Sequence, residues 1–233
     1  MNNQRSLFIG LLFAAWCFIV FSCNNNGVSP TSYSRLQVIN AIPGSLSFDC
    51  TLNYTKINSA SIAFPGASGY ISIAPGSKHV EIRPTTTPTA PFIDSTNVVL
   101  KQDSSYSLFF TGQNAAYNEI FIRDNLAVPP IGRAKIRFVN TSVGTAKVDI
   151  TINAVVGFTN IPYKGIGQFI EVPAGTYEFK AFTTGTATNL TTLSNQVLAD
   201  GKIYTLYAQG IVGNTTTSAF GLSLITNLLP AIK

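Results

Sequence analysis

The chain has 233 residues, of which 45% are hydrophobic and only 11% are charged, and its formal net charge is +5. The lysines and arginines are scattered and form no run, whereas nucleic-acid-binding proteins concentrate positive charge on one face or helix. This composition predicts a globular protein with one or two hydrophobic cores and no nucleic-acid partner.

The first predicted element is a signal peptide over residues 1–22. Arg5 supplies a short positive region, and residues 7–21 are apolar apart from glycine. That length is typical of a signal-peptide core and short for a helix that crosses a hydrocarbon layer of about 30 Å. Polar residues interrupt every later apolar run, so we expect no transmembrane segment in the mature chain.

The signal ends in Val20-Phe21-Ser22-Cys23, which resembles the bacterial lipobox. The resemblance implies cleavage before Cys23, a diacylglyceryl thioether on its sulfur, and acylation of the new N-terminus. Several acyl chains together anchor a protein stably, so we expect a lipid anchor in the cell envelope. Asn24 follows instead of a retaining aspartate, which favours the outer membrane. The alternative is an ordinary cleaved signal that leaves Cys23 as a free thiol.

The cysteines argue against a disulfide-dependent protein. Of the three, Cys17 leaves with the signal peptide and Cys23 takes the lipid, so Cys50 has no partner within the chain. Extracytoplasmic domains that depend on disulfides carry even sets of cysteines. We therefore expect a hydrophobic core to stabilise this protein.

The rest of the chain contains an internal repeat. The segment RLQVINAIPGSLSFDCTLN from Arg35 aligns without a gap with KIRFVNTSVGTAKVDITIN from Lys135. Two later pairs of blocks follow in the same order, ISIAPGSKHVEI with IEVPAGTYEFKA and NVVLKQDSSYSLFFTG with NQVLADGKIYTLYAQG. Three matching blocks in one order indicate two copies of one module.

The expected domain boundaries follow from this repeat. We expect a tether over 23–34, a first module over 35–126, a linker over 127–133 and a second module over 134–233. The linker contains two adjacent prolines, which cannot donate the hydrogen bonds of a central strand.

Each block alternates between apolar and polar residues. The predicted inward positions are Phe48, Cys50 and Leu52 in the first copy and Val148, Ile150 and Ile152 in the second. A period of two residues predicts half-buried strands, and turn signals such as IPGS, APGS and ADGK separate them. We therefore predict an all-β protein of two tandem antiparallel β-sandwiches.

The motifs IRFVN, VDITIN, VPAGTYEFKAF and LADGKIYTLYAQG resemble an uncharacterised domain family of bacterial secreted proteins and lipoproteins. Members of that family typically show V-R-x-V-H-A-S-P, V-P-A-G-x-Y and Y-T-V-x-A-x-G segments. The resemblance covers about residues 35–227. It implies immunoglobulin-like or transthyretin-like modules, often in tandem and lipid-anchored, with no established activity. The usual histidine of the family is replaced by Asn40 and Asn140.

No catalytic or metal-binding set is apparent. The only histidine, His79, is expected on the outward face with Glu81 and Arg83, because Val80 and Ile82 point inward. A nucleophile needs a base that reaches it, and no such pair is recognisable. One histidine and one buried cysteine cannot make a zinc site, and no calcium-binding loop occurs. We therefore expect no enzyme activity, no cofactor and no metal.

Three surface features remain. Asp49 and Asp149 are a duplicated carboxylate, which we expect to bond a neighbouring strand or turn. Two Thr-rich stretches, 83–97 and 183–195, are expected to be long loops. Phe109 and Tyr207 occupy outward positions, where they either stack on a ligand or lie between the modules.

The leading hypothesis is a lipid-anchored envelope protein with a non-catalytic binding, adhesion or structural role. Its expected partners are the membrane, through the lipid on Cys23, and a protein or glycan ligand. The alternative is a carbohydrate-binding accessory lipoprotein of a glycan-uptake system.

Overall fold

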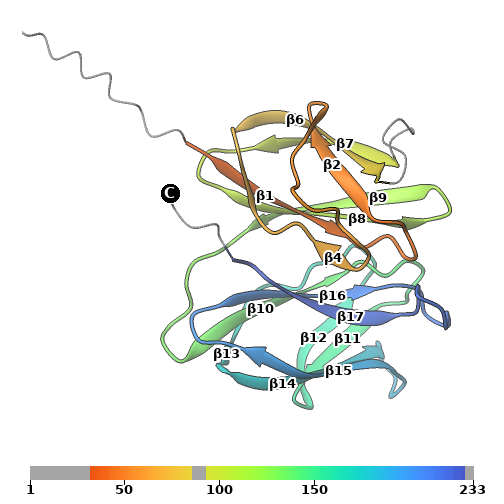
Figure 1. Cartoon of the computed structure of the whole chain (residues 1–233). Coiled ribbons are helices and arrows are strands. Elements are labelled where there is room, and N and C mark those ends of the chain that lie inside the picture. Colours follow the sequence, from red (N-terminus) through yellow and green to blue (C-terminus); the bar gives the residue numbers. More distant parts are fainter. Residues whose placement is uncertain (1–31, 86–92, 229–233) are drawn as a thin grey trace, which may run out of the picture. The chain divides into compact units, whose positions relative to one another are not determined.

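The computed structural model describes residues 32–85 and 93–228 (Figure 1). Every regular element in these ranges is a strand, which confirms the predicted all-β fold. Residues Ser32–Lys233 form one compact unit. Within it, residues 34–124 and 133–226 each build two sheets, and we call these segments the first and second module.

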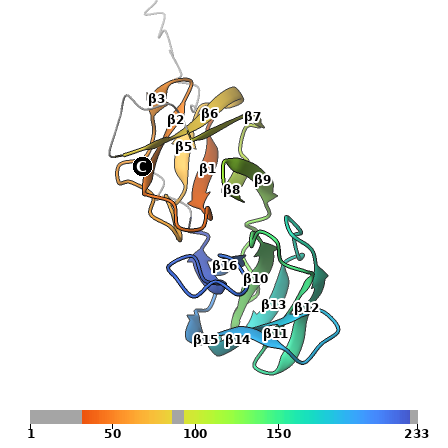
Figure 2. The same cartoon turned by 90° about the vertical axis from the view of Figure 1, so that its right-hand side faces the viewer.

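The first module consists of an outer sheet and an inner sheet (Figures 1 and 2). The outer sheet has the strand order β3 (Thr55–Lys56), β2 (Phe48–Leu52), β6 (Gly76–Pro84), β7 (Asp94–Leu100). The inner sheet has the order β4 (Gly66–Ala67), β1 (Ser34–Asn40), β8 (Ser105–Gln113), β9 (Ala116–Asp124), and β5 (Ile71–Ile73) also pairs with β1.

The second module repeats this arrangement. Its inner sheet has the order β13 (Ile170–Pro173), β10 (Arg133–Asn140), β16 (Ile203–Gln209), β17 (Gly221–Thr226). Its outer sheet has the order β12 (Val155–Ile161), β11 (Val148–Ile152), β14 (Gly175–Thr183), β15 (Asn189–Leu198).

Each inner sheet contains one parallel pair, which the sequence did not predict. β1 runs parallel to β8, and β10 runs parallel to β16, whereas the other paired strands are antiparallel. A parallel pair needs a long crossover connection, and here the outer sheet of each module is part of that connection.

The core of each module lies between its two sheets. The predicted inward positions are all buried: Phe48, Cys50 and Leu52 in the first core, and Val148, Ile150 and Ile152 in the second. The alternation in the sequence therefore predicted the strand register correctly in both copies.

Three hairpins close through two-residue turns that begin with asparagine: Asn53-Tyr54, Asn114-Ala115 and Asn153-Ala154. All six residues have positive φ angles, between 46° and 68°. This backbone is typical of a type I′ turn, which matches the twist of the flanking strands and favours Asn followed by Gly.

The two inner sheets pack against each other through a third apolar cluster. Phe109 and Tyr207 are both almost completely buried, with their ring centroids 5.7 Å apart. The buried members of the cluster are Ile39, Ala41, Phe109, Ile120, Ile122, Val139 and Tyr207. Of the two expectations for these aromatic residues, the structure therefore supports the contact between modules.

A buried polar network continues this contact. The guanidinium of Arg137 lies 2.6 Å from the carboxylate of Asp124 and donates to the hydroxyls of Thr205 and Ser107. The hydroxyl of Tyr70 donates to Asp124 at 2.6 Å. A buried ion pair offsets its desolvation only when its remaining groups are also bonded. These bonds connect β8 and β9 of the first module with β10 of the second.

The prediction of long Thr-rich loops is wrong for 183–195. β15 begins at Asn189, so only residues 184–188 connect it to β14. Threonine is β-branched and favours strands. Here Thr191 and Thr192 belong to β15 and pair with residues of β14. In 83–97, β6 extends to Pro84 and β7 begins at Asp94, while residues 86–92 lie outside the described ranges.

Candidate functional site

The predicted signal peptide over 1–22 and the predicted lipid site, Cys23, lie outside the described residues. Within the described ranges, no helix is long and apolar enough to cross a membrane. The same ranges contain no group of three or more His, Cys, Asp or Glu residues that could hold a metal ion.

The duplicated carboxylates bond their neighbours, as predicted. Asp49 accepts hydrogen bonds from Lys56 at 2.7 Å and from Asn58 at 3.0 Å. Asp149 accepts from the backbone of Asn160 and from the hydroxyl of Thr184, both at 2.7 Å. Burial raises the pKa of each carboxyl, but these hydrogen bonds outweigh it, so both pKa values lie below the usual range.

The asparagines at the family's histidine position are structural in both copies. Asn40 and Asn140 are fully buried. Their side-chain amides donate to the carbonyls of Ile62 and Ile161, each at 3.1 Å. Each side-chain oxygen accepts from the backbone two residues further on, at 3.2 Å. These residues therefore fix the ends of β1 and β10.

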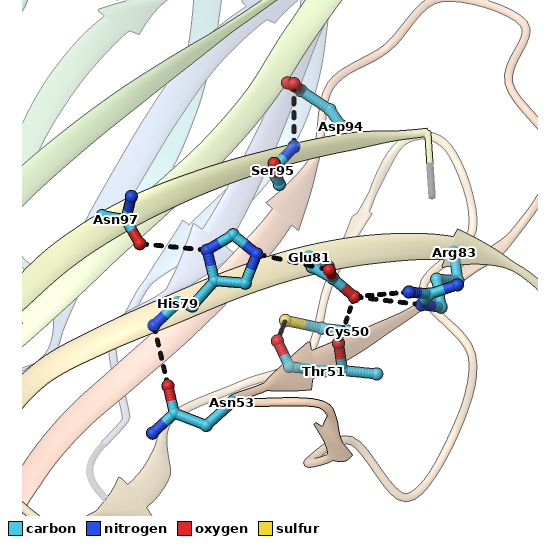
Figure 3. A network of polar contacts seen from close by, with 9 residues as sticks. All are labelled: Cys50, Thr51, Asn53, His79, Glu81, Arg83, Asp94, Ser95 and Asn97. Carbon is cyan, nitrogen blue, oxygen red and sulfur yellow. Dashed lines mark hydrogen bonds and ion pairs between the residues drawn. The ribbon is translucent and has the colours of Figure 1, made fainter. Parts of the chain in front are cut away.

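The outward face of the first module's outer sheet carries a network of polar side chains (Figure 3). The cross-strand partners pair Asp49 with Arg83, and Thr51 with Glu81. His79 is paired with Asn97 in the same way. His79, Glu81 and Arg83 share this face, as the alternation predicted.

Glu81 lies at the centre of this network and is only 3% exposed. One carboxylate oxygen accepts from Arg83 at 2.7 and 3.1 Å and from Thr51 at 3.4 Å. The other oxygen lies 3.2 Å from His79, whose second ring nitrogen lies 2.9 Å from Asn97. Burial raises the pKa of Glu81, but the bonds from Arg83 and His79 outweigh it, so its pKa lies below the usual range. Glu81 therefore orients both neighbours.

Tyr54 lies at the edge of the same face, in the turn between β2 and β3. Its side chain is exposed, at 76% for the whole residue, and its ring centroid is 5.7 Å from that of His79. The side chain of Asn53 accepts a hydrogen bond from the backbone of His79 at 2.9 Å, which ties the turn to β6. Tyr54 has a φ of 68°, which is unfavourable for a bulky residue.

A hollow of about 320 Å³ lies beside this network. It is lined by Asp49, Thr51, Tyr54, Lys56, Arg83 and Pro84. The ammonium group of Lys56 lies 2.7 Å from Asp49, and the guanidinium of Arg83 lies 2.7 Å from Glu81. The hollow therefore combines an exposed aromatic ring with oriented donors and acceptors whose charges balance.

The second module lacks this combination. Its strand register places other residues at the matching positions: Ala154 for Tyr54, Val156 for Lys56, Lys180 for Glu81 and Phe182 for Arg83. The hollow described here is thus a feature of the first copy.

Sequence reasoning missed Tyr54 and the burial of Glu81. One signal for Tyr54 was present in the sequence. The dipeptide Asn53-Tyr54 separates two alternating segments, and its counterpart in the second copy is Asn153-Ala154. Two-residue hairpin turns favour Asn-Gly at these positions, so a tyrosine there is unusual.

The fold and this site define a two-module, all-β protein whose copies have diverged on one outer face. The chain belongs to a family described as a domain of unknown function (DUF4397), which matches residues 34–151 and 134–231. The resemblance drawn from the sequence motifs is therefore confirmed, including its tandem copies.

Three solved structures are similar to parts of this chain. The Bacillus anthracis TIE protein is 12% identical with a TM-score of 0.27, and the match covers 84% of this chain and 44% of that one. A "putative cell adhesion protein" from Bacteroides eggerthii is 9% identical with a TM-score of 0.23, and the match covers 84% of this chain and 96% of that one. A second "putative cell adhesion protein", from Parabacteroides distasonis, is 8% identical with a TM-score of 0.22, and the match covers 84% of this chain and 98% of that one. No curated protein matches the chain.

Proposed function

We propose that this chain is a lipid-anchored protein of the bacterial cell envelope that binds a ligand without catalysing a reaction. The lipobox-like sequence that ends at Cys23 supports the anchor, and Asn24 in place of a retaining aspartate supports the outer-membrane location. The observation that carries the binding role is the hollow on the first module, where the exposed ring of Tyr54 lies with Lys56 and Arg83, and each of these two cations is held by a carboxylate.

The chemistry of the first module's outer sheet favours binding over catalysis. Among the described residues, the ring nitrogens of His79 contact Asn97 and Glu81, and neither of these partners is a hydroxyl or thiol nucleophile. Burial raises the pKa of the Cys50 thiol to about 12, with a smaller contribution from Asp49. A thiol in that state is inert, because the thiolate is the reactive form.

Two experiments test the two parts of this proposal. Fatty-acid labelling in the native host tests the anchor: wild type should take label and fractionate with outer membranes, and Cys23→Ala should do neither. Equal labelling of both would refute the anchor.

The binding role is tested with the chain that begins at Asn24, screened against arrays of polysaccharides and purified extracellular proteins. Thr51→Val and Lys56→Ala should weaken whatever interaction is found, since both residues line the hollow. Val156→Ala, at the matching position of the second module, is the control. Binding that resists both changes would exclude this site.

A second candidate function, a carbohydrate-binding accessory of a glycan-uptake system, is favoured by Tyr54. An exposed aromatic ring beside polar groups is suited to a ligand with both apolar and hydroxyl-bearing faces.

A further inference from the structure

We propose that the hollow on the first module binds a neutral sugar residue of a polysaccharide. This inference rests on the proposed binding function and names the ligand class of that same site.

The charges around the hollow favour a neutral ligand. Lys56 is paired with Asp49, and Arg83 is paired with Glu81, each at 2.7 Å. Because each cation is already paired with a carboxylate, an anionic or a cationic ligand gains little net attraction at this face. A neutral ligand leaves both pairs intact.

The polar groups instead match hydroxyls, which both donate and accept. A carboxylate offers about four lone-pair sites, and an ammonium offers three donors. The Asp49–Lys56 pair therefore retains acceptor and donor capacity at the rim of the hollow, where both side chains are partly exposed. Thr51 adds a hydroxyl to the lining. A sugar ring presents several hydroxyls, each of which can donate to one of these groups and accept from another.

Tyr54 supplies the apolar part of the site. Its ring is exposed beside His79, at the edge of the hollow. A left-handed backbone is unfavourable for tyrosine, and the second module has alanine at this position with a φ of 65°. Strained residues cluster at functional sites. An exposed aromatic residue kept in such a conformation is suited to stacking on the C–H face of a sugar.

The size of the hollow limits how much of the ligand it holds. A volume of about 320 Å³ is at the low end of the range of roughly 300–1,000 Å³ for ligand sites. The hollow therefore receives a short part of a polysaccharide, and the rest of the polymer remains outside it.

Affinity electrophoresis of the chain that begins at Asn24 tests this inference. The probes are the neutral polysaccharides xylan, mannan, laminarin and dextran, with polygalacturonate and heparin as acidic comparisons. We expect at least one neutral polysaccharide to retard the protein. Its effect should be the same from about 0.05 M to about 0.5 M salt, a range in which screening weakens ionic binding strongly.

Matched variants connect the binding to the ring. Tyr54→Ala should weaken binding about two- to tenfold, in line with loss of one stacking contact, and Tyr54→Phe should retain it. Ala154 occupies the same backbone conformation, so alanine is compatible with the turn, and a thermal melt verifies folding. Tyr33→Ala is the control, because Tyr33 is exposed but does not line the hollow.

Three outcomes would overturn the inference: retardation by the acidic polysaccharides alone, no retardation by any probe, or equal binding by wild type and Tyr54→Ala. The first two leave the proposed binding function standing if the array finds a ligand that depends on Thr51 and Lys56. Failure of that array arm refutes the proposed function itself.

Discussion

Replacing Tyr54 with glycine should make the protein more stable while removing its ligand binding. The residue adopts a φ of 68° in a two-residue turn. A left-handed conformation costs an L-residue about 1–2 kcal/mol, and glycine avoids this cost.

The size of the gain follows from two opposing terms. Glycine has more freedom in the unfolded chain, which returns about 0.4–1 kcal/mol to the unfolded state. The tyrosine is 76% exposed, so little buried surface is lost with its ring. We therefore expect Tyr54→Gly to raise the free energy of unfolding by about 0.5–1 kcal/mol.

Equilibrium urea unfolding of the chain that begins at Asn24 measures this change as a higher midpoint with an unchanged slope. Ala154→Gly is the matched control, because Ala154 has a φ of 65° in the equivalent turn. It should give a similar gain and leave binding unaffected. If Tyr54→Gly destabilises the protein while Ala154→Gly stabilises it, the Tyr54 side chain has a packing role, and its conformation is no sign of function.

Three further predictions concern stability. Ile150→Ala should lower the free energy of unfolding in urea by about 2–5 kcal/mol, because Ile150 is fully buried. Thr151→Ala, on the opposite face, should change it by no more than about 0.5 kcal/mol. A larger effect of Thr151→Ala than of Ile150→Ala would contradict the strand register. Asp124→Asn leaves a buried guanidinium without its counter-charge and should cost about 3–5 kcal/mol, so an unchanged melting temperature would argue against that ion pair. Because the folded-state pKa of Glu81 is lowered, its stabilisation is complete above the unfolded pKa of about 4.3 and is lost as the pH falls through the folded value. The stability difference between wild type and Glu81→Gln should therefore shrink as the pH falls below the unfolded pKa, and a constant difference would refute this assignment.

The strand registers could be predicted from the sequence because the alternation of side chains has a period of two residues. Once the repeat was recognised, Ile150 and its counterpart Cys50 had to lie on the same face of equivalent strands, and both are buried.

The neighbours of each face could not be predicted in this way. Alternation placed Phe109 and Tyr207 away from the cores of their own modules, but it contains no information about what covers them. The structure places them against each other. Strand order is likewise not a local property, so the parallel pairing of β1 with β8 was missed.

The candidate site was only partly predictable for a related reason. Its residues come from β2, the following turn, β3 and β6, and they meet only when the sheet forms. Sequence reasoning identified the shared face of His79, Glu81 and Arg83 but treated it as solvated. The burial of Glu81 depends on its neighbours across the sheet.

The contact between the inner sheets limits how such a protein grows by duplication. The inner sheet of each module already covers that of the other, through Phe109, Tyr207 and the Arg137–Asp124 pair. A third repeat attached by the same face would find no inner sheet to cover it, and its apolar side chains would be left in water. Longer proteins of this architecture should therefore gain repeats in pairs, in which the two new inner sheets cover each other.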